Sequence, residues 1–316
     1  FVAKVFNHMH HKRNALTLLE LIVVIVIVII VLAIAFPAIQ YAREGMRRSQ
    51  CQNHLKQIGL AIQNYHASFK QVPGLYNYSP SPINEFHCHS WRSAVLPLLE
   101  RTDVLQALRL DLASTSPENQ DVINLQIPVF ECPSTSTPTE IIPDLYLWRD
   151  ANGVFSQPTG TAARTDYAAI VGLRPESGNW LDADFGGWGE PKHSDSGQVR
   201  YPKRRFSDIT DGLSNTLLVG ERAGRPDRHG AGKPTIPFTV SAGMPDHHQA
   251  AWAVSTHAQH LVLAAEYAIN EDNGYGLFSF HGDGVNILLA DGSVRLLPVS
   301  TDRKTQRSLI SRAGHD

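Results

Sequence analysis

The sequence is poor in charge and lacks the motifs that mark common enzymes. Charged residues make up 18% of the 316 residues, and the formal net charge of −2 gives no sign of a nucleic-acid partner. No G-x-S-x-G, H-E-x-x-H or Walker pattern occurs, and no carboxylates have the spacing of an EF-hand. We therefore expect neither enzyme activity nor nucleic-acid binding, and no cofactor.

The main feature that is present is one long apolar run. Residues 16–36 contain a single charge, Glu20, and the run ends at Pro37. As a helix it would span roughly 32 Å, which is about the thickness of the hydrocarbon core of a bilayer. A carboxylate inside such a segment is costly in lipid and is a functional candidate for that reason.

The residues that flank the run separate three interpretations: a cleaved secretory signal peptide, a plain signal anchor and a pilin-type segment. A secretory signal would have an A-x-A site after the run, but the small residue here, Ala15, precedes it. Lys12 and Arg13 predict a cytoplasmic leader by the positive-inside rule. The rest of the chain is then expected on the outer side of the membrane.

This N-terminus resembles those of type IV pilins and type II secretion pseudopilins. In those families a prepilin peptidase cuts after a small residue, usually Gly, the new N-terminus is methylated, and the fifth mature residue is glutamate. A cut between Ala15 and Leu16 makes Glu20 the fifth residue and Pro37 the twenty-second, where pilin helices commonly carry a proline. The resemblance implies that the amine of Leu16, on the same or a neighbouring subunit, pairs with Glu20 during assembly.

Residues 41–71 predict an amphipathic helix that continues the apolar one. Its apolar stripe consists of Leu55, Ile58, Ile62, Tyr65 and Phe69. The Val72-Pro73-Gly74 sequence should end it, whereas Pro37 should kink the preceding helix without ending it.

Strand patterns follow later in the chain. They occur at residues 165–173, at 215–219 after the turn Thr210-Asp211-Gly212, and in a hairpin of residues 285–290 and 293–297. Asp291-Gly292 predicts a two-residue turn in that hairpin. The expected fold is α+β and pilin-like: a long N-terminal helix packed against an antiparallel sheet.

Five segments occur in order: CQNHLKQIGLAIQNYH (51–66), SWRSAVLPLLE (90–100), FECPS (130–134), ITDGLSNTLLVGE (209–221) and FSFHGDGVNILLADGSVRLL (278–297). In the last segment, nine residues separate His281 from Asp291 and Gly292. Together these segments resemble the bacterial pilin-like family known as domain of unknown function 1559, which has a prepilin-type N-terminus and the same C-terminal signature. The resemblance implies a pseudopilin-like, membrane-anchored component.

Three cysteines, Cys51, Cys88 and Cys132, allow one disulfide in an oxidising compartment. Cys51 and Cys132 both lie inside segments that resemble the family, which favours their pairing. Cys88–Cys132 remains the alternative.

Two sets of residues suggest metal sites, and each set has a simpler explanation. Calcium could bind among Asp211, Glu221, His281, Asp283 and Asp291, but these fit better as turn residues, with His281 bonded to a buried backbone group. The zinc candidates are His87, Cys88, His89, His247, His248, His257 and His260. Their spacing matches no standard zinc motif, so we expect no metal, with calcium as the alternative.

Residues 178–205 predict a long surface loop that is rich in glycine and aromatic residues. Trp180 and Trp188 could contact glycans or another subunit, although packing against the local core is the favoured interpretation.

The sequence thus predicts a leader at residues 1–15, a transmembrane helix at 16–40 and an extracytoplasmic α+β domain at 41–316. The favoured function is a pilin-like subunit, processed by prepilin peptidase, that crosses the bacterial inner membrane once and assembles with other pilin-like subunits in a type IV pilus or a type II secretion-like system. The alternative is a monomeric, membrane-anchored module that binds an unknown ligand outside the membrane.

Overall fold

The computed structural model describes residues 17–77, 88–112, 114, 116–135, 142–143, 161–174, 184–185, 188, 192–193, 199–200, 204–225, 227, 229–230, 251–255, 261–264, 268–274 and 276–310. The chain divides into two compact units, residues 1–46 and residues 47–316.

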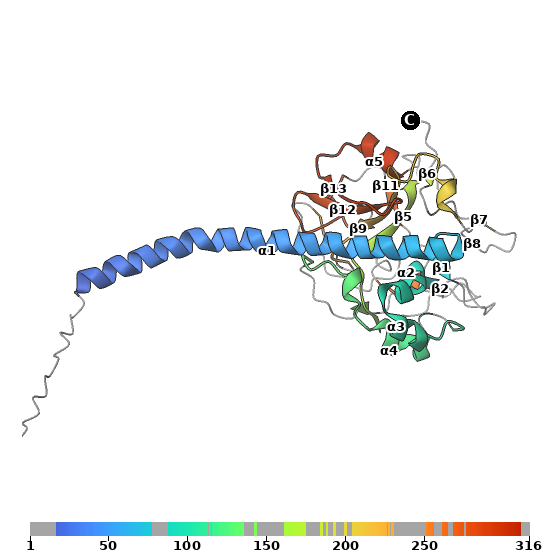
Figure 1. Ribbon diagram of the computed structural model, residues 1–316, viewed down its shortest axis with the longest axis horizontal. Helices are drawn as coiled ribbons and strands as arrows, with labels where there is room; N and C mark the ends of the chain where they lie inside the picture. Colours follow the sequence, from blue (N-terminus) through green and yellow to red (C-terminus); the bar gives the residue numbers. More distant parts are fainter. Residues whose placement is uncertain are drawn as a thin grey trace, which may run out of the picture. The chain divides into compact units, whose positions relative to one another are not determined.

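The first unit holds the beginning of helix α1 (Leu18–Phe69). This part of the helix is apolar on every side, and its side chains are exposed: Leu19 by 73%, Ile29 by 59% and Phe36 by 67%. Pro37 lies inside the helix, which continues through it as predicted (Figure 1). A proline removes one backbone hydrogen bond, and the neighbouring turns of this long helix keep theirs.

In the second unit the same helix buries one face. Its buried residues are Cys51, Leu55, Ile58, Gly59, Ala61 and Ile62. Tyr65 is partly buried against this core, whereas Phe69, which the sequence placed in the apolar stripe, is 60% exposed. That expectation was wrong because the helix ends at Phe69, where Lys70 adopts a positive φ of 57°.

The helix packs against a sheet with strand order β11-β5-β9-β12-β13. Its strands are β5 (Tyr167–Arg174), β9 (Leu217–Glu221), β12 (Gly284–Leu289), β13 (Val294–Pro298) and β11 (Leu261–Ala264), with β6 (Asp184–Phe185) paired to β5. Strands β5, β9, β12 and β13 are antiparallel, which confirms the predicted antiparallel sheet. β11 differs, because it pairs parallel to β5.

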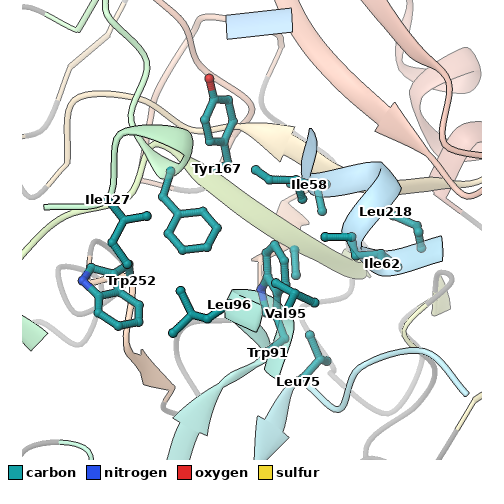
Figure 2. Close-up of a cluster of buried hydrophobic side chains, with 14 of the residues drawn as sticks. Ile58, Ile62, Leu75, Trp91, Val95, Leu96, Ile127, Tyr167, Leu218 and Trp252 are labelled. Atoms are coloured by element: carbon teal, nitrogen blue, oxygen red, sulfur yellow. The ribbon is translucent and has the colours of Figure 1, made fainter. Parts of the chain in front are cut away.

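Both faces of the sheet are covered, and residues alternate between them as strand geometry requires. On β5, Tyr167 and Ala169 join the core under α1, while Ala168 and Ile170 join a second core on the opposite face. The second core also holds Ile310, from helix α5 (Arg303–Ile310). Figure 2 shows the first core, in which side chains of α1, β5 and the short helices meet.

The remaining described elements are short. They are β1 (Tyr76–Asn77), β2 (Cys88–Ser90), α2 (Trp91–Val95), α3 (Thr102–Ala107), α4 (Gln120–Ile123), β3 (Ile142–Pro143), β4 (Thr161–Ala162), β7 (Lys192–His193), β8 (Val199–Arg200), β10 (Val254–Ser255) and the 3₁₀ helices η1 (Leu96–Leu99), η2 (Pro117–Asn119), η3 (Pro128–Phe130) and η5 (Phe206–Asp208). The SWRSAVLPLLE segment therefore forms α2 and η1, with the Ser90 side chain capping α2.

The C-terminal hairpin has a longer loop than the sequence suggested. The amide of Leu289 donates to the carbonyl of Ser293 at 2.9 Å, and the amide of Gly292 donates to the carbonyl of Leu289 at 3.0 Å. These bonds enclose a three-residue loop in which Gly292 has a φ of 85°, rather than a two-residue turn. The Asp291 carboxylate accepts from the amide of Ser293 at 2.8 Å, which stabilises the wider turn.

Gly284, at the start of β12, generates the first prediction. A methyl group there would press against the carbonyl oxygen of Leu297 on the paired strand. Gly284→Ala is therefore expected to lower the free energy of unfolding by about 1–3 kcal/mol. Urea unfolding of the detergent-solubilised chain, followed by tryptophan fluorescence, measures the change.

The matched control is Gly45→Ala, because nothing lies within 4 Å of the position where that methyl group would be added. Equal unfolding midpoints for the Gly284 and Gly45 variants would contradict the close approach of β12 and β13.

Candidate functional site

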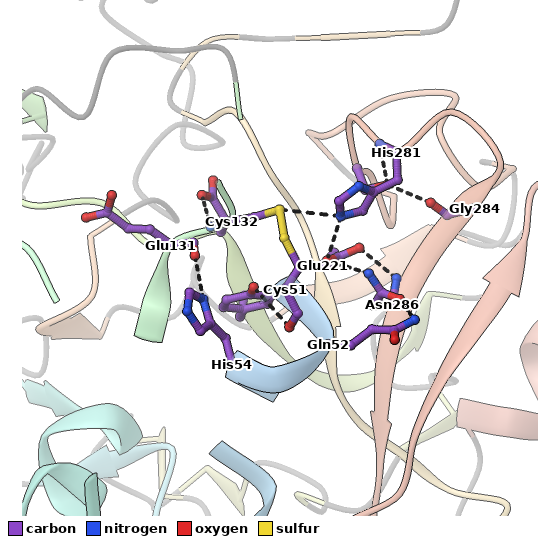
Figure 3. Close-up of polar contacts among 12 residues, drawn as sticks. Cys51, Gln52, His54, Glu131, Cys132, Glu221, His281, Gly284 and Asn286 are labelled. Atoms are coloured by element: carbon purple, nitrogen blue, oxygen red, sulfur yellow. Dashed lines mark hydrogen bonds and ion pairs between the residues drawn. A yellow bond between two sulfur atoms is a disulfide. The ribbon is translucent and has the colours of Figure 1, made fainter. Parts of the chain in front are cut away.

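A disulfide joins the long helix to the segment that follows η3. Cys51 and Cys132 are bonded, 81 residues apart in sequence, with their Cα atoms 5.3 Å apart. This is the pair that the sequence favoured. Both residues are buried, and Figure 3 shows the bond beside two further buried side chains, Glu221 and His281.

His281 and Glu221 meet at this disulfide. The His281 Nε2 lies 3.5 Å from the Cys132 Sγ and 3.5 Å from the Glu221 Oε1. Its ring therefore contacts two buried side chains, which the sequence did not predict. The side chains of His281 and Glu221 are almost fully excluded from solvent, at 1% and 0% exposure.

Asn286 on β12 fixes the orientation of the Glu221 carboxylate. Its backbone amide donates to Oε2 at 2.6 Å, and its side-chain amide donates to Oε1 at 3.0 Å. The side-chain oxygen of Asn286, Oδ1, in turn accepts from the side-chain amide of Gln52, the neighbour of Cys51, at 3.0 Å. A buried carboxylate needs such partners, because an unpaired one is strongly disfavoured away from water. The resulting network links α1, β9, β12 and the His281 loop.

The other residues of the calcium hypothesis do not join this group. Asp283 is exposed and forms an ion pair with Arg48 at 2.5 Å, and Asp291 serves the hairpin turn. Of the described acidic, cysteine and histidine residues, only Cys51, Cys132, Glu221 and His281 bring possible ligand atoms together. Asp211 lies outside that group, near the turn that precedes β9.

Of the proposed zinc residues, only His89 has a described side chain. It is buried, and its Nε2 lies 3.1 Å from the carbonyl oxygen of Leu112. The side chain of Cys88 and residues His87, His247, His248, His257 and His260 lie outside the described part of the chain.

Trp188 belongs to the core, in line with the packing interpretation. It is 3% exposed, its ring lies 5.5 Å from that of Trp91, and its indole N–H donates to the carbonyl oxygen of Leu218 at 2.8 Å. Trp180 lies outside the described residues.

A buried ionic network next to the disulfide was not predicted. The carboxylate of Asp166 accepts from the amides of Cys132 at 2.8 Å and Gly224 at 3.1 Å, and Arg164 lies 3.7 Å away. Burial lowers the pKa of Arg225 to about 9, and burial together with the charge of Arg225 lowers the pKa of Arg92 to about 9. No sequence pattern identifies this network, because it joins side chains from segments far apart in the chain.

Glu131 and His54 connect the segment that follows η3 to α1. The His54 Nδ1 lies 2.9 Å from the carbonyl oxygen of Glu131. Burial raises the pKa of the Glu131 carboxyl to about 7; the nearby Arg164 opposes this shift and Asp166 adds to it. The Oε1 atom of Glu131 is buried and has no hydrogen-bond partner among the described residues.

At the start of α1, Glu20 and Thr17 form a capping box. The amide and the hydroxyl of Thr17 donate to the Glu20 carboxylate at 2.9 and 3.0 Å, and the Glu20 amide donates to the Thr17 hydroxyl at 3.3 Å. The signal was present in the sequence as T-x-x-E, a known helix start. Ala15 and Leu16 lie outside the described residues.

Helix α1 is long and apolar enough to cross a membrane. Its most apolar 18-residue window has a mean hydropathy of 3.5, and none of that window is buried. Length and composition alone would also admit a signal sequence.

Glu131 generates a prediction about pH. The native carboxyl keeps its proton to about pH 7, whereas the unfolded one ionises near its ordinary value of 4.5. Its contribution to stability is therefore present at low pH and is lost as the pH rises from about 4.5 through 7. Glu131→Gln should leave stability at pH 4.5 nearly unchanged and increase it at pH 8, as measured by urea unfolding.

The control is Glu118→Gln, at an exposed carboxylate of η2. If the free energy of unfolding depends on pH in the same way in both variants, burial of the Glu131 carboxyl does not influence stability.

Comparison with known proteins gives two family matches. Residues 40–304 match the family described as "Protein of unknown function (DUF1559)", and residues 10–36 match the "Prokaryotic N-terminal methylation motif". No curated protein and no solved structure matches the chain. The methylation motif and the exposed apolar helix together fit a prepilin-like, membrane-anchored subunit. Since the first match covers most of the sequence, the chain belongs to the DUF1559 family, and its fold is the α+β, pilin-like one that the sequence predicted.

Proposed function

We propose that this chain is a structural, non-enzymatic pilin-like subunit of a type IV pilus or a type II secretion-like assembly. The observation that carries the proposal is the coincidence of the methylation motif at residues 10–36 with the exposed, apolar start of α1. That motif implies processing by a prepilin peptidase and assembly with pilin-like subunits.

The apolar start of α1 needs a non-aqueous environment. Side chains such as Ile25 and Val28 are 48% exposed, and burying the remaining half of each would contribute roughly 1 kcal/mol. Lipid supplies that burial before assembly, and the helices of neighbouring subunits supply it in a filament. With Lys12 and Arg13 on the cytoplasmic side, the chain crosses the inner membrane once and the second unit lies outside.

Glu20 links processing to assembly. Its carboxylate is already bonded to Thr17, so the capping box offsets part of the cost of placing a charge in lipid. A cut after Ala15 converts the nitrogen of Leu16 into a free amine directly before Thr17. This creates a cation at the end of the helix that can pair with Glu20 of the same or a neighbouring subunit.

The first test is processing. On co-expression with an active prepilin peptidase, the purified chain should begin at Leu16 and carry a methyl group on its α-amine. Mass spectrometry of the N-terminal peptide measures both changes, and Ala15→Lys, which removes the small residue, should block them. A chain that keeps Ala15 bonded to Leu16 in the presence of the active peptidase would favour a plain membrane anchor.

The second test is assembly. Glu20→Ala should leave membrane insertion intact but reduce incorporation into sheared filaments about tenfold, which corresponds to a loss of roughly 1.4 kcal/mol per subunit. Quantitative immunoblotting of membrane and sheared fractions measures the ratio. Glu44→Ala, which removes a carboxylate farther along α1, is the matched control and should incorporate normally. Equal recovery of the Glu20 variant and the wild type would contradict the assembly role.

A further inference from the structure

Four of the five sequence segments that resemble the family meet at one buried point. Cys51 comes from α1, Cys132 follows η3, Glu221 ends β9 and His281 precedes β12. One possible ligand atom from each lies within 4.8 Å of the others, and all four residues are buried (Figure 3). Two sulfurs, an imidazole and a carboxylate are the donor types that zinc takes in proteins.

We propose that these four side chains bind one Zn²⁺ ion when the Cys51–Cys132 disulfide is reduced. A tetrahedral zinc ion with bond lengths of about 2.0–2.3 Å places its ligand atoms about 3.3–3.8 Å apart. The His281 Nε2 already has this spacing, at 3.5 Å from the Cys132 Sγ and 3.5 Å from the Glu221 Oε1. Breaking the disulfide lets the two sulfurs separate to the same distance.

Neighbouring hydrogen-bond donors hold the Glu221 carboxylate in an orientation that suits a zinc ligand. Asn286 donates through its backbone to the Glu221 Oε2 and through its side chain to Oε1, the oxygen nearest His281. Metal-binding carboxylates are usually fixed by outer hydrogen bonds of this kind. Gln52 orients the Asn286 side chain, so the positioning shell reaches back to the helix that carries Cys51.

The donor set selects the metal. Thiolate and imidazole ligands suit zinc, whereas calcium takes only oxygen ligands. This site therefore differs from both the calcium alternative and the histidine-based zinc candidates that the sequence suggested. It does not depend on membrane assembly.

Metal and disulfide exclude each other. A dithiol reductant transfers two electrons and two protons to the Cys51–Cys132 bond and becomes a disulfide itself. The two thiols then lose their protons to solvent as Zn²⁺ binds, and both sulfurs become ligands. In either state a cross-link ties α1 to the segment after η3, so the second unit keeps this connection in reducing and oxidising conditions.

The experiment compares two redox states of one protein. The full chain in detergent, with Cys88→Ser so that only two thiols are present, is prepared oxidised or reduced with a phosphine under oxygen-free conditions. Non-reduced peptide mapping verifies the Cys51–Cys132 bond in the oxidised sample. After equilibration with Zn²⁺ and removal of free metal, elemental analysis counts the bound zinc.

The reduced protein is expected to hold one zinc ion more per chain than the oxidised protein. Both samples carry the same fifteen histidines, so the oxidised sample measures zinc bound elsewhere. Co²⁺ in place of Zn²⁺ should give thiolate charge-transfer absorption in the reduced sample only. Equal zinc content in the two states, or a reduced chain that unfolds without binding zinc, would overturn the proposal.

Variants separate ligands from neighbours. His281→Gln and Glu221→Gln should weaken zinc binding to the reduced protein, and Asn286→Ala, at a positioning residue, should weaken it about 10–100-fold. His54→Gln is the matched control, because this half-buried histidine lies three residues after Cys51 on α1 but its Nδ1 faces the carbonyl oxygen of Glu131. Wild-type zinc affinity in the His281 variant would contradict the site, since binding would then not need the imidazole.

Discussion

The second unit depends on one interface, where the face of α1 that carries Leu55, Ile58 and Ile62 lies on the sheet. These three side chains are at most 1% exposed, so the helix cannot leave the sheet without exposing the centre of the core. Gly59 permits the approach, because a side chain there would come within 2.6 Å of the Leu288 Cδ1 on β12. Burial of apolar surface is the dominant favourable term in folding. The sheet, the hairpin and the buried polar cluster are all positioned by this contact.

Much of this arrangement could be predicted from local patterns. Alternating Val285, Ile287 and Leu289 identified β12, because a strand that carries apolar residues on every second position must bury that face. The helix was predictable for the same reason, from apolar spacing of three and four. The parallel pairing of β11 with β5 could not be predicted, because it joins segments far apart in sequence and depends on the rest of the sheet. The extra residue in the hairpin loop was also hidden, since Gly292 suits both a two-residue and a three-residue loop.

The candidate site was predicted residue by residue but not as a site. Cys51, Cys132, Glu221 and His281 were each noted in the sequence, yet they were divided between a disulfide and a calcium hypothesis. Their convergence depends on α1 crossing the sheet, which no local pattern reports. The bonding of Thr17 to Glu20 could have been predicted, because T-x-x-E is itself a helix-start signal.

The convergence also gives a physical reason why these segments occur together in one chain. Glu221 can stay buried only with the amides of Asn286 and the ring of His281 beside it, and Asn286 keeps its orientation through Gln52. Replacing one member would leave another polar group buried without its partner, at a cost of roughly 1–3 kcal/mol or more for a charged group. The motifs are therefore coupled through the interior of the domain. The segments that supply Glu221, His281, Asn286 and Gln52 therefore form the inner framework of the second unit.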